Sequence, residues 1–505
     1  MSESTLEAPP IRKPASLPPE SPTAAEPWTL RKFVREHPWW TTAVVLVLIS
    51  TALVLWAGTR PSYDAYGWLV WGYQTLHLTL DLGGAPSWKP LPYLFTVPFA
   101  LAGHYELRLW MIAVVAVSLA GCVFAGRIAY RLIGRGTERR YPAIVGAVFA
   151  GAAVLGLEDY MHYILSAQTD PMIVTFCLAA LDCYLGGRRR WAFWLLALAS
   201  LGRPEVWLFF GAYSVWLWWR FPSMRTMVAA GLVFVPFMWF GIPWITNHRP
   251  LVSAQLALGS PRELRQNRVT GTIGRFTELE YLPVWLAALV GCALALVRRD
   301  RVVLWLAGAC VAWVIIEIAF ALHGWPALPR YMFEAAAVAA VIGGVAVGWV
   351  LTDPGALWRA VPRWAGVPVV VVLMASLVPA AFARVRSEHT DLRHERARTH
   401  EIALLQTTLG VLGGYQHIRN CGEPVTNVEY VSTLAWFEHL DVGFVGHRPE
   451  FELHQTYPIV LFTPVNKGWL VLPWHTRANQ LGRCLPLHSE FVTTRRHPNG
   501  ALLRR

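Results

Sequence analysis

Long apolar segments recur along most of this chain, and they constrain its fold more than any other feature. Many are about 17–25 residues long, which is the length at which an α-helix crosses the hydrocarbon core of a bilayer. Of the 505 residues, 55% are hydrophobic and only 15% are charged, whereas soluble globular proteins carry about 25% charged residues. The chain is therefore predicted to be an α-helical polytopic membrane protein.

Arginine clusters between the apolar segments predict the topology, because short basic loops remain in the cytoplasm. The clusters lie at 127–140, 188–190, 220–225, 298–301 and 359–363. With all of them inside, the apolar segments pair into about eleven spans. These are 39–57, 107–130, 141–157, 169–187, 190–203, 205–219, 227–246, 281–297, 302–322, 331–351 and 365–384. The N-terminus is then cytoplasmic, the chain after Arg384 is extracytoplasmic, and the protein is predicted to lie in the cell membrane.

Composition divides the chain into three parts. Residues 1–38 form a Pro-rich, then basic cytoplasmic tail, of which residues 1–27 are predicted to be disordered. Residues 39–384 form the membrane domain, and residues 385–505 form a small extracytoplasmic α/β domain. The outer face of the membrane domain carries the loops 58–106, 158–168 and 247–280.

Shorter segments give local expectations within these parts. The proline-containing segment 90–104 is too short to span and is predicted to be a half-helix in the outer leaflet. In the C-terminal domain we expect a charged helix over 391–406 and strands near 425–431, 457–462 and 469–473.

Charge and cysteine usage exclude several partners. The net charge of +12 is accounted for by the inside loops, so the expected partner is the bilayer and not nucleic acid. Five of the seven cysteines lie in apolar segments, and only Cys421 and Cys484 lie in the C-terminal domain. That pair forms a disulfide if the domain is extracytoplasmic. No cysteine and histidine spacing typical of a zinc site occurs, so neither a metal nor another cofactor is predicted.

Asp64 is the acid that most needs an explanation. It lies in the segment Gly58-Thr-Arg-Pro-Ser-Tyr-Asp-Ala-Tyr-Gly67, a few residues beyond the first span. One interpretation is structural, with Ser62 or Asp64 capping a helix that begins at Ala65. The other is a general base that removes a proton from a hydroxyl group. We predict that Asp64 is catalytic and keep the cap as the structural alternative.

Three cations fall on the same predicted outer face. Lys89 lies in Pro-Ser-Trp-Lys-Pro, Arg203 in Arg-Pro-Glu between two short spans, and Arg330 just before a span. An outward arginine runs against the positive-inside bias, so an anion is expected to compensate it, and a phosphate would do so. The structural alternatives are a snorkelling anchor for Lys89 and an ion pair with Glu205 for Arg203.

Further polar and aromatic residues on that face are candidates for contacts with a substrate. Acids and histidines there would either be solvated or bind a sugar, and aromatic rings would stack on sugar faces. Asp170, at the start of a predicted span, is interpreted by default as a helix cap. The candidates are Tyr63, Tyr66, Glu158, Asp159, His162, Glu205, His323 and Tyr331.

In the order of these motifs, the chain resembles the GT-C superfamily, the polytopic glycosyltransferases that use polyprenyl-phosphate sugar donors. The resemblance covers about residues 39–350, and its overall look is of an actinobacterial cell-envelope member. It rests on Asp64-Ala-Tyr66, Lys89-Pro-Leu-Pro-Tyr93, Leu107-Arg-Leu109, Leu201-Gly-Arg-Pro204 and Pro329-Arg-Tyr331.

The resemblance implies roles for residues at the matching positions. Asp64 would be the catalytic base, Glu158 or Asp159 the acid of the second loop, and Arg203 and Arg330 contacts to the donor phosphate. This chain lacks the acidic pair that some members carry in the first outer loop. That departure argues against a metal-dependent mechanism.

These observations predict an inverting membrane glycosyltransferase. It would move a monosaccharide, mannose or arabinofuranose, from a polyprenyl-phosphate donor to an extracytoplasmic glycan or lipoglycan acceptor. Lys89, Arg203 and Arg330 would hold the donor phosphate, and Asp64 would deprotonate the acceptor. Two alternatives stay open: a transporter or flippase of lipid-linked sugars, for which internally repeated spans are expected, and a non-catalytic scaffold for envelope assembly.

Overall fold

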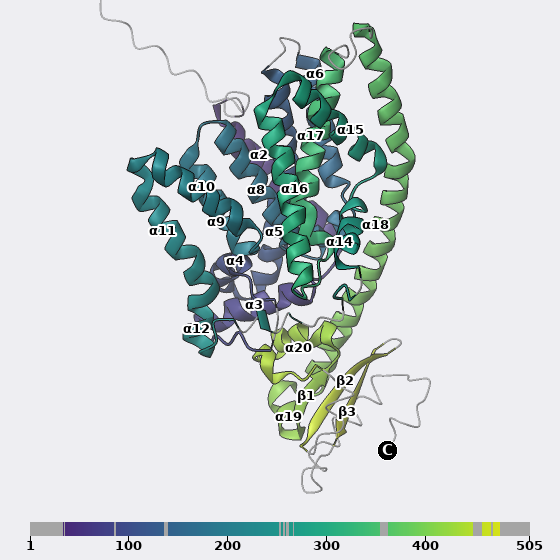
Figure 1. The fold of residues 1–505 in the computed structure, drawn as a ribbon. Coiled ribbons are helices and arrows are strands. Elements are labelled where there is room, and N and C mark those ends of the chain that lie inside the picture. The colour runs from purple at the N-terminus through teal and green to yellow at the C-terminus, as the bar shows by residue number, and fades with distance from the viewer. Residues whose placement is uncertain are drawn as a thin grey trace, which may run out of the picture. The chain divides into compact units, whose positions relative to one another are not determined.

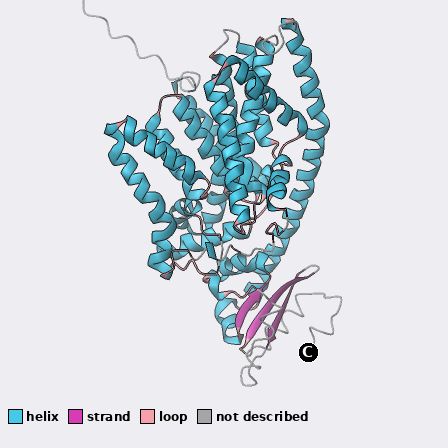
Figure 2. Cartoon of the chain, viewed as in Figure 1, coloured by secondary structure: helices cyan, strands magenta, loops and turns pink. Residues whose placement is uncertain are grey.

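The computed structural model describes residues 34, 36–84, 87–135, 140–251, 254–255, 258, 262–265, 267–353, 362–447, 457–465 and 468–474. The chain divides into a short N-terminal unit, Met1–Val45, and a large unit, Leu46–Arg505. Most of the predicted cytoplasmic tail lies outside the described residues. Helices make up most of the described chain, and its three strands are confined to the C-terminal part (Figures 1 and 2).

The helices follow one another closely along the chain. The first α-helices in the described residues are α2 (Pro38–Ala57), α3 (Tyr63–Leu76), α4 (Pro90–Ala100), α5 (Glu106–Gly134), α6 (Arg140–Leu155), α7 (Tyr160–Leu165), α8 (Asp170–Leu185), α9 (Arg189–Gly202) and α10 (Val206–Arg220). Then come α11 (Arg225–Pro236), α12 (Ile242–Asn247), α14 (Arg268–Thr277), α15 (Leu282–Arg298), α16 (Arg301–Leu322), α17 (Phe333–Thr352) and α18 (Gly366–Val411). The C-terminal part adds α19 (Gly414–Cys421), β1 (Glu423–Thr426), α20 (Val431–Glu438), β2 (Ile459–Val465) and β3 (Gly468–Trp474).

The described helices confirm a multi-pass α-helical protein. Six of them are long and apolar enough to cross a membrane, or seven if α14 and α15, which are bent by 97°, count as one broken span. Ten of the eleven predicted spans each fall on one helix, and the span 227–246 covers α11, a π-helical segment (Phe237–Gly241) and α12, which together form one continuous candidate span. However, α6, α8, α9 and α10 have only 14–16 residues, fewer than the about 20 that span a bilayer alone. By length and composition the count is therefore six to seven, below the predicted eleven.

Helix α17 forms the centre of the helical bundle. Nearly all its residues are buried, and it packs against α6, α15 and α16. It approaches α6 closely, because a Cβ atom built on either Gly146 or Gly344 would overlap the carbonyl oxygen of the other glycine. Small residues allow such backbone contact between membrane helices. The Ala- and Gly-rich sequence of α17 is thus explained by neighbours on all its sides.

Arginines of the predicted inside loops converge on one buried acid. Arg127 and Arg131 of α5 and Arg188, which precedes α9, each lie 3.1–3.2 Å from a carboxylate oxygen of Asp182 in α8. Asp182 is fully buried. A buried carboxylate needs such partners, so these arginines connect α5, α8 and α9 in addition to any role in topology.

The helical bundle continues into the C-terminal part without a break. Helix α18 has 46 residues, so the predicted boundary after Arg384 and the predicted helix over 391–406 both lie inside one helix. Along its length, Arg384 forms an ion pair with Glu158. Arg396 donates a 2.8 Å hydrogen bond to the carbonyl oxygen of Ala57, at the end of α2.

The C-terminal sheet has the strand order β1-β2-β3. Strand β1 pairs with β2 in parallel, and β2 pairs with β3 antiparallel. The predicted strands near 457–462 and 469–473 are confirmed as β2 and β3. The predicted strand over 425–431 is wrong in its second half, because β1 ends at Thr426 and α20 begins at Val431. Residues of α20 are buried against α3, and such tertiary packing outweighs the β-propensity of single residues.

Cys421 is disulfide-bonded, whereas Cys122, Cys177, Cys183, Cys292 and Cys310 are free thiols. Cys484, its expected partner, lies outside the described residues.

We expect Gly344→Ala to destabilise the bundle by about 1–3 kcal/mol, because the added methyl group overlaps the α6 backbone. Thermal unfolding of the purified protein in detergent measures this effect. Gly308→Ala in α16 is the matched control, since a Cβ atom there meets nothing within 4 Å. Equal melting temperatures for the two variants would contradict the close α6–α17 contact.

Candidate functional site

Five charged residues that are distant in sequence meet at the ends of helices. Asp64 lies in the first turn of α3, Lys89 directly precedes α4, and Asp170 is the first residue of α8. Arg203 follows the last residue of α9, and Arg330 lies in a short 3-10 helix before α17. We call these five residues the charged cluster. The N-termini of α3, α4, α8 and α17 meet at this cluster, and helix N-termini favour anions.

Asp170 holds the cluster together. Its side chain is fully buried and forms ion pairs with Arg203, with the Lys89 ammonium at 3.6 Å and with Arg330 Nε at 3.9 Å. Thr169, and not Asp170, occupies the cap position of α8, so the default interpretation of Asp170 as a helix cap is wrong. The three predicted cations therefore already share one internal counter-ion, which the sequence alone did not reveal.

Arg330 lies between the two aspartates of the cluster. Its guanidinium is 3.8 Å from Asp64 Oδ2 and 3.9 Å from Asp170 Oδ2. Both contacts are longer than a hydrogen bond. Arg330 Nε is buried and has no hydrogen-bond partner among the described residues. Arg330 thus retains a donor for an additional acceptor while it sits beside Asp64.

Arg203 is the most enclosed of the cations. It lies on the ring of Tyr331, 3.9 Å from the ring centre, and its Nη1 is 3.3 Å from Glu205 Oε1. The ion pair with Glu205 that the sequence offered as a structural alternative is therefore present. Because Arg203 is only 3% exposed and touches two acids, it is positioned more tightly than Arg330.

Lys89 donates a 3.3 Å hydrogen bond to the Thr169 hydroxyl. Burial lowers the pKa of the Lys89 ammonium, and the neighbouring Asp170 carboxylate opposes that change. The charged form of Lys89 therefore depends on nearby anions. An additional anion at this site would stabilise the ammonium further.

Asp64 lies between two tyrosines of the sequence, Tyr63 and Tyr66, at the start of α3. No side-chain cap bond is formed at the start of α3, so a capping role for Ser62 or Asp64 has no support in the geometry. Burial, followed by the charge of Asp64, raises the pKa of Tyr63 to about 12. Tyr63 therefore keeps its proton at neutral pH. Of the two carboxylates next to Arg330, Asp64 is the more exposed, at 17% against 0% for Asp170.

Other predicted contact residues lie elsewhere. Glu158 pairs with Arg384 of α18, His323 is exposed and contacts the Ala319 carbonyl oxygen, and Tyr66 packs on Phe437 of α20. For Asp159 and His162, which flank the start of α7, no hydrogen bond or ion pair joins the side chain to the charged cluster among the described contacts. The structure thus gathers Asp64, the three cations, Glu205 and Tyr331, and no described hydrogen bond or ion pair joins the second-loop acids to them.

Two acids near the cluster were passed over in the sequence. Glu317 of α16 and Glu334 of α17 are buried. Glu317 lies against Glu205, and the carboxylate oxygens of Glu334 have no hydrogen-bond partner among the described residues. Both lie within electrostatic range of Arg203. Each is a single acid in or at the start of a long apolar segment, and such residues commonly mark functional or paired positions. That signal was sufficient to find them.

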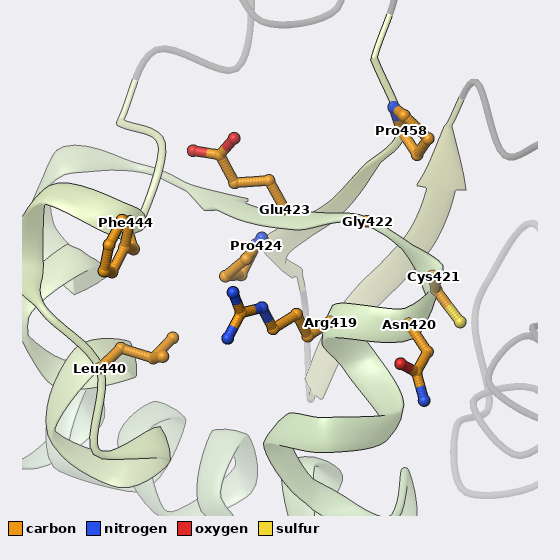
Figure 3. A pocket seen from close by; sticks show the side chains of 9 residues that line it. All are labelled: Arg419, Asn420, Cys421, Gly422, Glu423, Pro424, Leu440, Phe444 and Pro458. Atoms are coloured by element: carbon orange, nitrogen blue, oxygen red, sulfur yellow. The ribbon is translucent and has the colours of Figure 1, made fainter.

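A surface hollow of about 370 Å³ lies in the C-terminal part, away from the charged cluster. It is bordered by α19, β1 and the chain after α20, and Figure 3 shows Arg419 extending toward Pro424 and Leu440. No residue of the cluster lines it.

No group of three or more histidine, cysteine or acidic side chains with a metal-binding arrangement occurs among the described residues. The acids of the cluster instead face arginine and lysine. The arrangement is therefore suited to hold an anion next to a carboxylate.

Comparisons with known proteins assign the chain to no family. No protein-family model matches the chain, and no curated protein matches it. A solved structure, ArnT from Cupriavidus metallidurans bound to undecaprenyl phosphate, resembles it with a TM-score of 0.48 and 14% sequence identity. The alignment covers 85% of this chain and 93% of the ArnT chain. At these values the likeness assigns no residue and no activity to this chain.

We expect Asp170→Asn to destabilise the protein by about 3–5 kcal/mol, since it leaves three cations without their shared counter-ion. Thermal unfolding in detergent is the measurement. Glu205→Gln is the comparison variant, and its loss should be smaller because Arg203 keeps Asp170. A larger loss for Glu205→Gln than for Asp170→Asn would remove Asp170 from the centre of the network.

Proposed function

We propose that the protein is a membrane glycosyltransferase that transfers a monosaccharide from a polyprenyl-phosphate donor to an acceptor outside the membrane. The observation that carries this proposal is the position of Arg330, with an unpaired donor, between the Asp64 carboxylate and the cations around Asp170. A binding position for an anion and a candidate base therefore lie next to each other.

A phosphate is the anion that suits the cluster best. Arg330 and Arg203 offer planar guanidinium groups and Lys89 a compact ammonium, which are the usual protein ligands of phosphate. The cluster lies at the ends of membrane helices, so a lipid tail attached to that phosphate would extend along the bundle. A polyprenyl-phosphate sugar combines both features.

In the proposed reaction Asp64 takes the proton from an acceptor hydroxyl, whose oxygen attacks the anomeric carbon of the donor sugar. The bond between that carbon and the phosphate oxygen breaks, and its electron pair passes to the phosphate. Lys89, Arg203 and Arg330 stabilise the negative charge that develops there. A single displacement of this kind inverts the anomeric configuration.

The finer identity of the substrates follows the motif resemblance to the GT-C superfamily. It favours mannose or arabinofuranose as the sugar and a glycan or lipoglycan of the cell envelope as the acceptor. Transfer assays with purified protein and a panel of polyprenyl-phosphate sugars test both, with product linkage determined by nuclear magnetic resonance.

We expect Asp64→Asn to lower the transfer rate by about 10²–10⁴-fold, the usual contribution of a general base. Binding of the donor lipid should remain, because the three cations are retained. Glu278→Gln, an exposed acid at the end of α14, is the control and should transfer at the wild-type rate. Full activity of a well-expressed Asp64→Asn protein would exclude Asp64 as the base.

We expect Arg330→Gln to weaken donor binding about 10–100-fold, as a lost hydrogen bond to a charged group does, and Arg330→Lys to recover part of it. Titration with polyprenyl phosphate in nanodiscs gives the affinity. Arg393→Gln, an exposed arginine of α18, controls for net charge. Equal affinities for the Arg330 and Arg393 variants would separate Arg330 from the donor phosphate.

A further inference from the structure

Helix α20 of the C-terminal part packs along α3, the helix that carries Asp64 (Figure 1). Tyr66 lies 6.4 Å from Phe437 and Tyr73 lies 4.7 Å from His439, measured between ring centres. Gln74 hydrogen-bonds to Asp441, just beyond α20. We call this contact, together with Ser87 and Trp88 of the loop after α3, the α3–α20 seam.

The seam contains buried polar atoms that lack partners. Ser432 and Thr433 are fully buried, and their hydroxyls have no hydrogen-bond partner among the described residues. The same is true of the Ser87 hydroxyl and the Trp88 ring nitrogen. The Tyr63 hydroxyl lies close enough to Ser432 for the two side chains to interact. Buried polar groups are normally paired, so this concentration points to a polar ligand that completes them.

Gly67 marks where such a ligand would approach Asp64. A Cβ atom built on Gly67 would lie 3.5 Å from the Ser432 hydroxyl and 3.9 Å from the Ser87 hydroxyl. Gly67 is three residues after Asp64 in α3, so both lie on one face of the helix. Ser87 is two residues before Lys89. The hydroxyls of Ser432 and Ser87 therefore lie near the proposed base, Asp64, and near Lys89, one of the proposed phosphate contacts.

We propose that the α3–α20 seam is the acceptor site, and that it opens so that the hydroxyl groups of a glycan acceptor pair with Ser87 and Ser432. This inference rests on the proposed function. The ligand is assigned to the acceptor because α20 contains no cation, whereas the donor phosphate is held by residues at the ends of the bundle helices. The C-terminal part thus takes part in acceptor binding directly.

A reversible crosslink across the seam tests this proposal. In a variant with Gly67→Cys and Ser432→Cys, the Cβ atom at position 67 would lie 3.5 Å from the position of the Ser432 hydroxyl, within reach of a disulfide. Transfer and donor binding are measured on the oxidised and the reduced protein. We expect oxidation to slow transfer at least about tenfold and to leave the donor affinity within about twofold, with recovery on reduction.

The control variant carries Gly67→Cys with Ser432→Ala and cannot form this crosslink. It should show the same transfer rate oxidised and reduced, as should the wild type, which controls for the disulfide of Cys421. Peptide mass spectrometry confirms the crosslink. A crosslinked protein that transfers as fast as its reduced form, or that loses donor affinity instead, overturns the proposal.

Ser432→Val supplies a second measurement if the crosslink forms poorly. Its KM for the acceptor should rise at least about tenfold while the KM for the donor is unchanged. An unchanged acceptor KM overturns the acceptor site even when wild-type transfer is robust. Failure of the proposed function is recognised separately, because the wild type would then transfer no sugar from any polyprenyl-phosphate donor.

Discussion

The buried carboxylate of Asp170 is the group on which the candidate site depends. It is shared by Lys89, Arg203 and Arg330, which come from three different parts of the chain. Bringing cations out of water costs several kcal/mol per ion unless an opposite charge accompanies them. Asp170 provides that charge at the first residue of α8, so the cations can be held at the ends of apolar helices before any ligand arrives.

Together with Glu205, the charged cluster is balanced in formal charge, but its hydrogen bonds are incomplete. Asp64, Asp170 and Glu205 offset Lys89, Arg203 and Arg330 in formal charge, yet the contacts of Arg330 are too long for hydrogen bonds. In a purely structural network, each buried donor would be expected to have a hydrogen-bond acceptor. The retained donor beside Asp64 is the reason that a phosphate and a base are inferred at one place. The same reasoning, applied to unpaired hydroxyls, connects α20 to this site.

Much of the site was accessible from the sequence because charged residues are rare in this chain. Asp64, Lys89, Arg203 and Arg330 were selected as ionisable groups at the ends of apolar segments, and the structure brings all four together. Asp170 was misinterpreted, since an acid at a helix start has an ordinary local explanation. Glu317 and Glu334 were passed over within apolar segments. Glu158, Asp159 and His162 were grouped with the site because they lie on the same predicted outer face of the membrane domain. Residues can share that face without contacting one another.

The sequence by itself determined the fold class and the positions of the helices, because apolar segments of bilayer length have few alternatives to helix. It also determined β2 and β3. Only the tertiary structure decided which ionisable groups share a counter-ion, that α18 continues through the predicted domain boundary, and that Val431 begins a helix packed on α3. These outcomes depend on contacts between residues distant in the chain, and local sequence patterns carry no information about such contacts.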